Sequence, residues 1–162
     1  MPQPTRHPSR GFTLVEILIV VVILGILASI VIPQFGSATQ QSKTAATASI
    51  VRTVQAKVFE DFATQGVYAS TINDDWFVEG SLPTNPLAPE QKTPVVLYDT
   101  AATADMTHPA TKIVSATGAF WYNAINGTFR ALVPAQGTQA ATLELYNTAN
   151  SSGVANYGDT TD

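Results

Sequence analysis

One carboxylate stands inside an otherwise uncharged apolar run near the N-terminus of this chain. The run extends over residues 12–32, and Glu16 is its only ionisable side chain. A carboxylate within a membrane or a bundle of apolar helices is unfavourable unless a positive group lies within reach. The chemistry that this pattern predicts is charge pairing between neighbouring helices, and the nearest candidate cation would be a free amine at Phe12.

The rest of the sequence contains no recognisable set of catalytic residues. Cysteine is absent, and the only histidines are His7 and His108, so a zinc site of the usual ligand count would need acids for its other ligands. The motifs of nucleophilic hydrolases, phosphate-binding loops, zinc proteases and EF-hands are not found. With 8 basic against 12 acidic residues, the chain has no basic patch for nucleic acid. We expect neither an enzyme nor a nucleic-acid partner.

The apolar run has the length of a membrane-spanning helix. As an α-helix it would extend roughly 31 Å, close to the thickness of a bilayer's hydrocarbon core. Arg6 and Arg10 precede it without any acid, which predicts a cytoplasmic N-terminus and an outward-facing remainder. A secretory signal peptide is disfavoured, because the run is too long and the first A-x-A triplet begins only at Ala46. A plain single-pass anchor gives no reason for Glu16.

The helix is expected to continue as an amphipathic segment over residues 34–66. Gly66 is a reasonable stop, and Pro33 is expected to interrupt one helical hydrogen bond and produce a kink. Apolar residues recur at steps of mostly three and four, which predicts one face packed against a core; they are Phe35, Ala38, Ala45, Ala48, Val51, Val54, Val58 and Phe62.

Residues 67–162 predict a small globular head. A proline-rich loop over 81–94 cannot be a central strand, and the aromatic side chains expected to anchor the loops are Tyr68, Trp76 and Phe77. Residues 94–98, 112–115, 119–123 and 128–133 predict antiparallel strands, with a hairpin at Asn126-Gly127 and an edge strand at 142–146. The tail from Asn147 is expected to be a mobile end or a loop over the sheet.

The string Gly11-Phe12-Thr13-Leu14-Val15-Glu16, followed by ILIVVVILGILASIVIPQF, resembles the class III signal of type IV pilins and type II secretion pseudopilins. The resemblance implies that a prepilin peptidase cuts between Gly11 and Phe12 on the cytoplasmic face and methylates the new N-terminal Phe12. It also implies that Glu16 pairs with the Phe12 amine of an adjacent subunit during assembly. Proline at the depth of Pro33 is common in this family.

The fold implied is an α+β, pilin-like one, with a long protruding N-terminal helix packed on a small antiparallel sheet. Its parts would be a leader at 1–11, a transmembrane or filament-core helix at 12–33, an amphipathic half at 34–66 and the head at 67–162. The function expected is a pseudopilin-like structural subunit of a type II secretion system, assembled into a periplasmic filament after processing. One alternative is a major or minor subunit of a type IV pilus, serving adhesion, motility or DNA uptake. Another is an uncleaved single-pass membrane-anchored binding domain.

The partners implied are copies of the chain, other pilin-like subunits, the prepilin peptidase and an inner-membrane assembly platform, with the lipid bilayer before assembly. The location implied is the inner membrane, followed by a periplasmic or cell-surface filament. The order of QGVYAS, SLPTNPLAP, FWYN and GTFRALV in the head is similar to that of major pseudopilins, which often bind calcium in a C-terminal loop. No cofactor is expected, with calcium as the alternative. The sequence contains no calcium-loop motif that would identify calcium ligands, although carboxylate oxygen atoms are available in Asp99, Asp105, Asp159 and Asp162.

Overall fold

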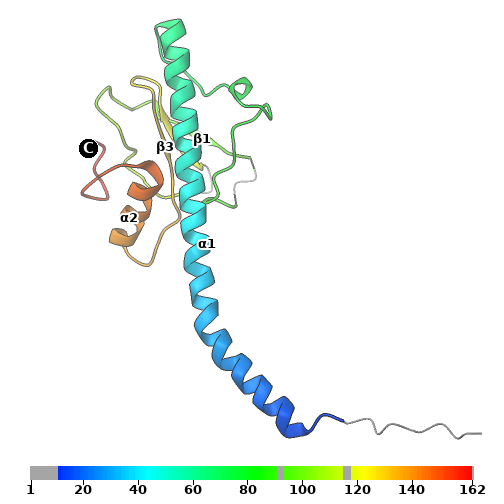
Figure 1. Cartoon of the computed structure of the whole chain (residues 1–162). Coiled ribbons are helices and arrows are strands. Elements are labelled where there is room, and N and C mark those ends of the chain that lie inside the picture. The colour runs from blue at the N-terminus through cyan, green and yellow to red at the C-terminus, as the bar shows by residue number, and fades with distance from the viewer. Residues whose placement is uncertain (1–10, 91–92, 115–117, 162) are drawn as a thin grey trace, which may run out of the picture. The chain divides into compact units, whose positions relative to one another are not determined.

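A long N-terminal helix and a small sheet form the α+β architecture that the sequence predicts. The computed structural model describes residues 11–90, 93–114 and 118–161. Outside the described residues lie positions 1–10 of the predicted 1–11 leader, positions 91–92 of the proline-rich loop, the end of the predicted strand at Ser115, and Asp162. The elements in chain order are α1 (Leu14–Gln65), the 3-10 helix η1 (Asp74–Trp76), β1 (Val96–Tyr98), β2 (Phe120–Asn123), β3 (Thr128–Ala131) and α2 (Gln139–Asn150) (Figure 1). The chain forms two compact units, residues 1–40 and 41–162.

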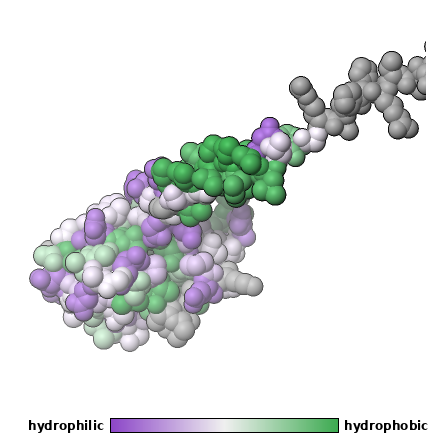
Figure 2. Space-filling view, turned by 90° about the horizontal axis from the view of Figure 1, so that it is seen from below, coloured by the Kyte–Doolittle hydropathy of each residue, from purple (hydrophilic) through white to green (hydrophobic). Residues whose placement is uncertain are grey.

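The first unit contains the apolar part of α1. The helix begins at Leu14, two residues later than predicted, and its backbone remains helical through position 33. A kink at Pro33 therefore stays a prediction. Among the described residues, α1 is the one helix that is long and apolar enough to cross a membrane. Figure 2 shows the hydrophobic residues gathered over this part of the chain.

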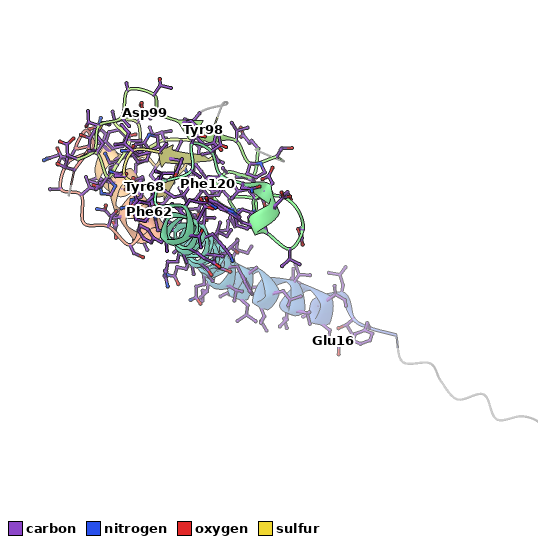
Figure 3. The ribbon with its side chains drawn as sticks, turned by 90° about the horizontal axis from the view of Figure 1, so that it is seen from above. Glu16, Phe62, Tyr68, Tyr98, Asp99 and Phe120 are labelled. Carbon is purple, nitrogen blue, oxygen red and sulfur yellow. The ribbon has the colours of Figure 1, made fainter. Side chains whose placement is uncertain are left out.

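The second unit is built around the part of α1 that follows Gln40. Its helical positions Val51, Val54 and Val58 are buried against the sheet residues Phe120 and Phe129. The predicted apolar face is confirmed from Ala48 to Val58, but Ala45 is exposed and Phe62 is only partly covered, stacked on Tyr68 at a ring distance of 4.2 Å (Figure 3). The predicted aromatic anchors Tyr68, Trp76 and Phe77 pack against this core. The helix ends as predicted at Gly66, which has a positive φ of 75°.

The sheet has the order β1-β2-β3 and is mixed. β2 and β3 form the predicted antiparallel hairpin, with Asn123 opposite Thr128 and with Gly127 at a φ of 72° in the turn. β1 runs parallel to β2, with Val96 opposite Phe120, so the prediction of a wholly antiparallel sheet is wrong. The alternation of inward- and outward-facing residues along a short strand is the same whether the strand pairs in the parallel or the antiparallel direction. The long connection between β1 and β2 is what permits the crossover that a parallel pair needs.

Two predicted strands are not extended strands in the structure. Residues 142–146 belong to α2, whose first turn is capped by Thr138 and whose buried side chains recur at helical spacing at Thr142, Tyr146 and Ala149. The sequence TLELY satisfies both an alternating and a helical pattern, and the capping threonine decides for the helix. Of the predicted strand at 112–115, only Ile113 forms an isolated bridge, with Val133. The tail from Asn147 begins inside α2 and continues as a coil with Val154 buried.

Side-chain amides satisfy the outer edge of β3. Gln55 of α1 accepts from Phe129 N at 2.9 Å and donates to Gly127 O at 2.6 Å. Asn150 of α2 accepts from Ala131 N at 2.7 Å and donates to Ala131 O at 2.9 Å. The two amides thus take the place of a fourth strand, because each offers the donor and acceptor that a backbone would offer.

Asn85 joins three parts of the head through its buried amide. Its Oδ1 accepts hydrogen bonds from Thr47 Oγ1 on α1 at 3.0 Å and from Leu87 N at 2.9 Å. Its Nδ2 donates to Ala119 O at 3.0 Å and to Leu132 O at 2.9 Å. The side chain is 1% exposed, so every one of these bonds is made away from water. Asn85 therefore ties the proline-rich loop to the helix and to the chain beside the sheet.

Because of Tyr122, the head is expected to lose stability at alkaline pH. Burial, with smaller contributions from Asp61, Tyr68 and Tyr98, raises the pKa of Tyr122 from 10.0 to about 12. The folded state therefore disfavours the tyrosinate, and the stability present below pH 10 is lost as the pH rises towards 12. We expect the wild type to lose about 1–2 kcal/mol more than Tyr122→Phe over this interval, because the hydroxyl is only part-buried and solvent screens part of the effect. Urea unfolding of both full-length chains in detergent between these pH values measures the difference, and parallel curves would contradict it.

Candidate functional site

The start of α1 is held by reciprocal hydrogen bonds between Thr13 and Glu16. Glu16 N donates to Thr13 Oγ1 at 3.2 Å, while Glu16 Oε2 accepts from both Thr13 N and Thr13 Oγ1 at 2.8 Å. This is the arrangement of a capping box, in which the residue before the helix and the third helical residue satisfy each other's backbone amides. It explains why the helix begins at Leu14 rather than at Phe12.

The role of Thr13 could have been found in the sequence. A threonine followed three residues later by glutamate, just before an apolar run, is a known signal for a helix start. The sequence analysis interpreted Glu16 only as an electrostatic partner. The structure adds that its carboxylate also orders the first turn of its own helix.

The predicted processing and assembly residues are adjacent at this helix start. Gly11 and Phe12 lie directly before it, outside any helix or strand. Phe12 is 81% exposed, and no atom lies within 4 Å of where a Cβ of Gly11 would be. Glu16 follows within one helical turn (Figure 3). Pro33 is not part of this group, because it lies roughly 26 Å further along the helix.

The part of α1 that carries Glu16, residues 14–32, is apolar on all sides. The large side chains between Leu14 and Ile32 are exposed around its whole circumference, with exposed fractions from 43% to 83%. A helix with this surface needs a membrane or other apolar helices to cover it. Glu16 is the single ionisable group within residues 12–32, so any environment that covers this part of α1 must also stabilise its carboxylate.

Residues 6–32 match the family model of the prokaryotic N-terminal methylation motif. Over 38 residues the chain is 58% identical to the type II secretion system core protein G of Pseudomonas aeruginosa, covering 24% of this chain and 27% of that protein. Over 58 residues it is 48% identical to the type IV narrow pilus major component PilA5 of Thermus thermophilus, covering 30% of this chain and 50% of that protein. The N-terminal segment of the chain is therefore similar to that of pilin-like proteins.

The matches to known proteins cover only the N-terminal part of this chain. They span about a quarter of the length of one curated relative and half of the other. No solved structure matches it. The matched residues 6–32 contain Gly11, Phe12 and Glu16, so the family resemblance and the site geometry concern the same segment.

The acids considered for calcium have other partners in the structure. Asp99 accepts from Ala101 N and Trp121 Nε1, Asp105 from Thr103 Oγ1, and Asp159 from Asn156. Within residues 11–90, 93–114 and 118–161, no three acidic or histidine side chains are grouped so that they could hold a metal ion. His108 is fully buried, with its Nδ1 2.9 Å from Tyr146 Oη.

Proposed function

We propose that this chain is a structural filament subunit rather than an enzyme, and specifically a pseudopilin-like subunit of a type II secretion system. The observation that carries the proposal is Glu16. It is the one ionisable group within residues 12–32, whose large apolar side chains are exposed, and it lies in the first helical turn after the expected cut at Gly11. The 58% identity to the type II secretion core protein G over 38 residues supports the more specific choice.

Processing would create the positive partner that Glu16 needs. Cleavage between Gly11 and Phe12 by a prepilin peptidase leaves an amine on Phe12, which the enzyme then methylates. Both residues are exposed and lie outside the helix, which leaves the bond between them accessible to a peptidase. The amine of Phe12 then lies at the same depth as Glu16 on neighbouring subunits.

The capping box orients Glu16 for this pairing. Both hydrogen bonds from Thr13 go to Oε2, and among the described residues no hydrogen bond reaches Oε1. A carboxylate has acceptor sites on both oxygens, so one oxygen can order the first turn while the other binds the ammonium of an adjacent subunit. Pairing of this kind would fix the register between neighbouring helices.

The apolar surface of residues 14–32 would be suited both to the membrane and to the filament interior. In the bilayer, lipid covers the side chains of residues 14–32, and in the filament the same side chains pack against other subunits. The partners proposed are copies of this chain, other pilin-like subunits, the prepilin peptidase and an inner-membrane assembly platform. The N-terminus would be cytoplasmic and the head outward, first in the inner membrane and then in a periplasmic or surface filament.

The second candidate function is a major or minor subunit of a type IV pilus. The 48% identity to PilA5 over 58 residues, covering half of that protein, favours it. Deletion of this chain in its host distinguishes the two. Loss of a surface filament indicates the pilus, whereas retention of normally secreted enzymes inside the cell indicates the secretion system. An uncleaved membrane-anchored binding domain would show neither effect.

Intact mass and N-terminal sequencing of the chain from its host's membranes test the processing. We expect a start at methylated Phe12 in the wild type. Gly11→Val is expected to retain the leader, because the resemblance implies a cut directly after a glycine. Gly25→Val is the matched control, since Gly25 lies within α1, away from the expected cut, and has equally open surroundings, and it should be processed normally. A wild-type chain that starts at Met1 would refute processing and leave only a membrane anchor.

A further inference from the structure

Three main-chain carbonyls converge on one buried amine in the C-terminal part of the head. Lys112 Nζ donates to Asp159 O at 2.6 Å, to Tyr157 O at 2.7 Å and to Pro109 O at 3.3 Å. The side chain of Lys112 is 0% exposed, and its Nζ lies 5.6 Å from the centre of the Tyr146 ring. Three acceptors require three N–H donors, which only the protonated amine has.

The charge of Lys112 is compensated mainly by backbone oxygens. Within the described part of the chain, the one ion pair closer than 4.0 Å is Lys57–Glu60, on the surface. The carboxylate of Asp159 binds Asn156 N and Asn156 Nδ2 instead. Burial lowers the pKa of Lys112, and the negative charge of Asp159 opposes that shift from a greater distance. A buried cation of this kind persists when its hydrogen bonds are satisfied, as they are here by carbonyls and an aromatic face.

Lys112 holds the C-terminal segment, residues 157–160, onto the head. The main chain of Lys112 is itself bonded to Val133 N at 3.1 Å, so its position is set by the chain that follows β3. Thr160 O, at the end of the segment, accepts from Thr107 N at 2.9 Å and from His108 N at 3.0 Å. The segment therefore contributes three carbonyls to this side of the head, and two of them depend on the Lys112 ammonium.

The residues around this point do not fit calcium. Calcium takes six to eight oxygen ligands that usually include carboxylates. Here the convergent oxygens are main-chain carbonyls already bound to Nζ, and Asp99, Asp105 and Asp159 each have other partners. We infer that Lys112 is a built-in cation that takes the place of a bound metal ion. The order of the segment 157–160 is accordingly independent of calcium.

Hydrogen exchange on the full-length chain in detergent tests this inference. The amides of Thr107 and His108 are direct probes, because they are protected only while Thr160 O is in place. For the wild type we expect the same exchange with EDTA as with excess calcium chloride. Faster exchange in EDTA would overturn the inference, and this comparison needs no variant.

Substitution of the lysine provides the second arm of the test. In Lys112→Met, exchange at Thr107, at His108 and over residues 153–161 is expected to rise about tenfold or more, while the amides of α1 after Gln40 remain protected. Lys57→Met, which removes an exposed lysine, is the matched control and should leave these rates unchanged. Unchanged protection in Lys112→Met would show that the carbonyls do not need this cation.

Discussion

Asn85→Ala is expected to destabilise the head by about 3–5 kcal/mol, the largest stability effect of any single substitution considered for this chain. The alanine removes two donors and an acceptor that serve four buried groups at once. Thr47 Oγ1, Leu87 N, Ala119 O and Leu132 O would each lose a partner. Water cannot easily replace the amide, because the site is 1% exposed. Each stranded group then adds its own desolvation cost.

Urea unfolding of the full-length chain in detergent, followed by the fluorescence of the buried Trp121, measures this loss. Asn73→Ala is the matched control, since Asn73 is exposed and accepts one hydrogen bond from Asp75 N; we expect it to cost about 1 kcal/mol or less. Asn85→Asp should also be strongly destabilising, because a carboxylate cannot donate to Ala119 O and Leu132 O. A loss below about 1 kcal/mol for Asn85→Ala would mean that the loop rearranges to satisfy these groups.

Glu16→Ala is expected to abolish or strongly reduce incorporation into filaments, by about tenfold or more, while membrane insertion and cleavage continue. Removing the carboxylate makes the apolar helix easier to insert, and the cut lies before it. Assembly loses the partner for the Phe12 amine, which would then be desolvated among apolar helices without compensation. Sheared or cross-linked filament fractions, compared with total membrane protein by immunoblot, give the ratio of assembled to unassembled chain.

Two further variants separate pairing from capping at this site. Glu16→Gln keeps an oxygen that can accept from Thr13 but has no charge, and it should assemble as poorly as Glu16→Ala. Thr13→Val removes the hydroxyl of the capping box but keeps the carboxylate, and it should assemble nearly as well as the wild type. Normal assembly of Glu16→Gln would assign Glu16 a capping role only, and normal assembly of Glu16→Ala would remove it from the mechanism.

The parts of this protein that the sequence determines by itself are those governed by local rules. Apart from Glu16, the run over residues 12–32 is uncharged and apolar, which predicts a helix that lipid or other helices cover. Glu16 is conspicuous within this run because a charge there is unfavourable. Gly66 ends the helix and Asn126-Gly127 turns the hairpin because glycine adopts positive φ without strain. Thr13 belongs to the same class, since its capping role depends on a residue only three positions away.

Only the tertiary structure decided the direction of β1, the fate of residues 142–146 and the roles of Asn85 and Lys112. Strand direction depends on how a long connection folds back, which alternation does not encode. Asn85 and Lys112 look like ordinary polar residues in the sequence, because their partners include carbonyls distant in the chain and every residue has a carbonyl. Backbone acceptors leave no signature in side-chain pattern, so a buried amide or cation that binds them becomes visible only after the chain has folded.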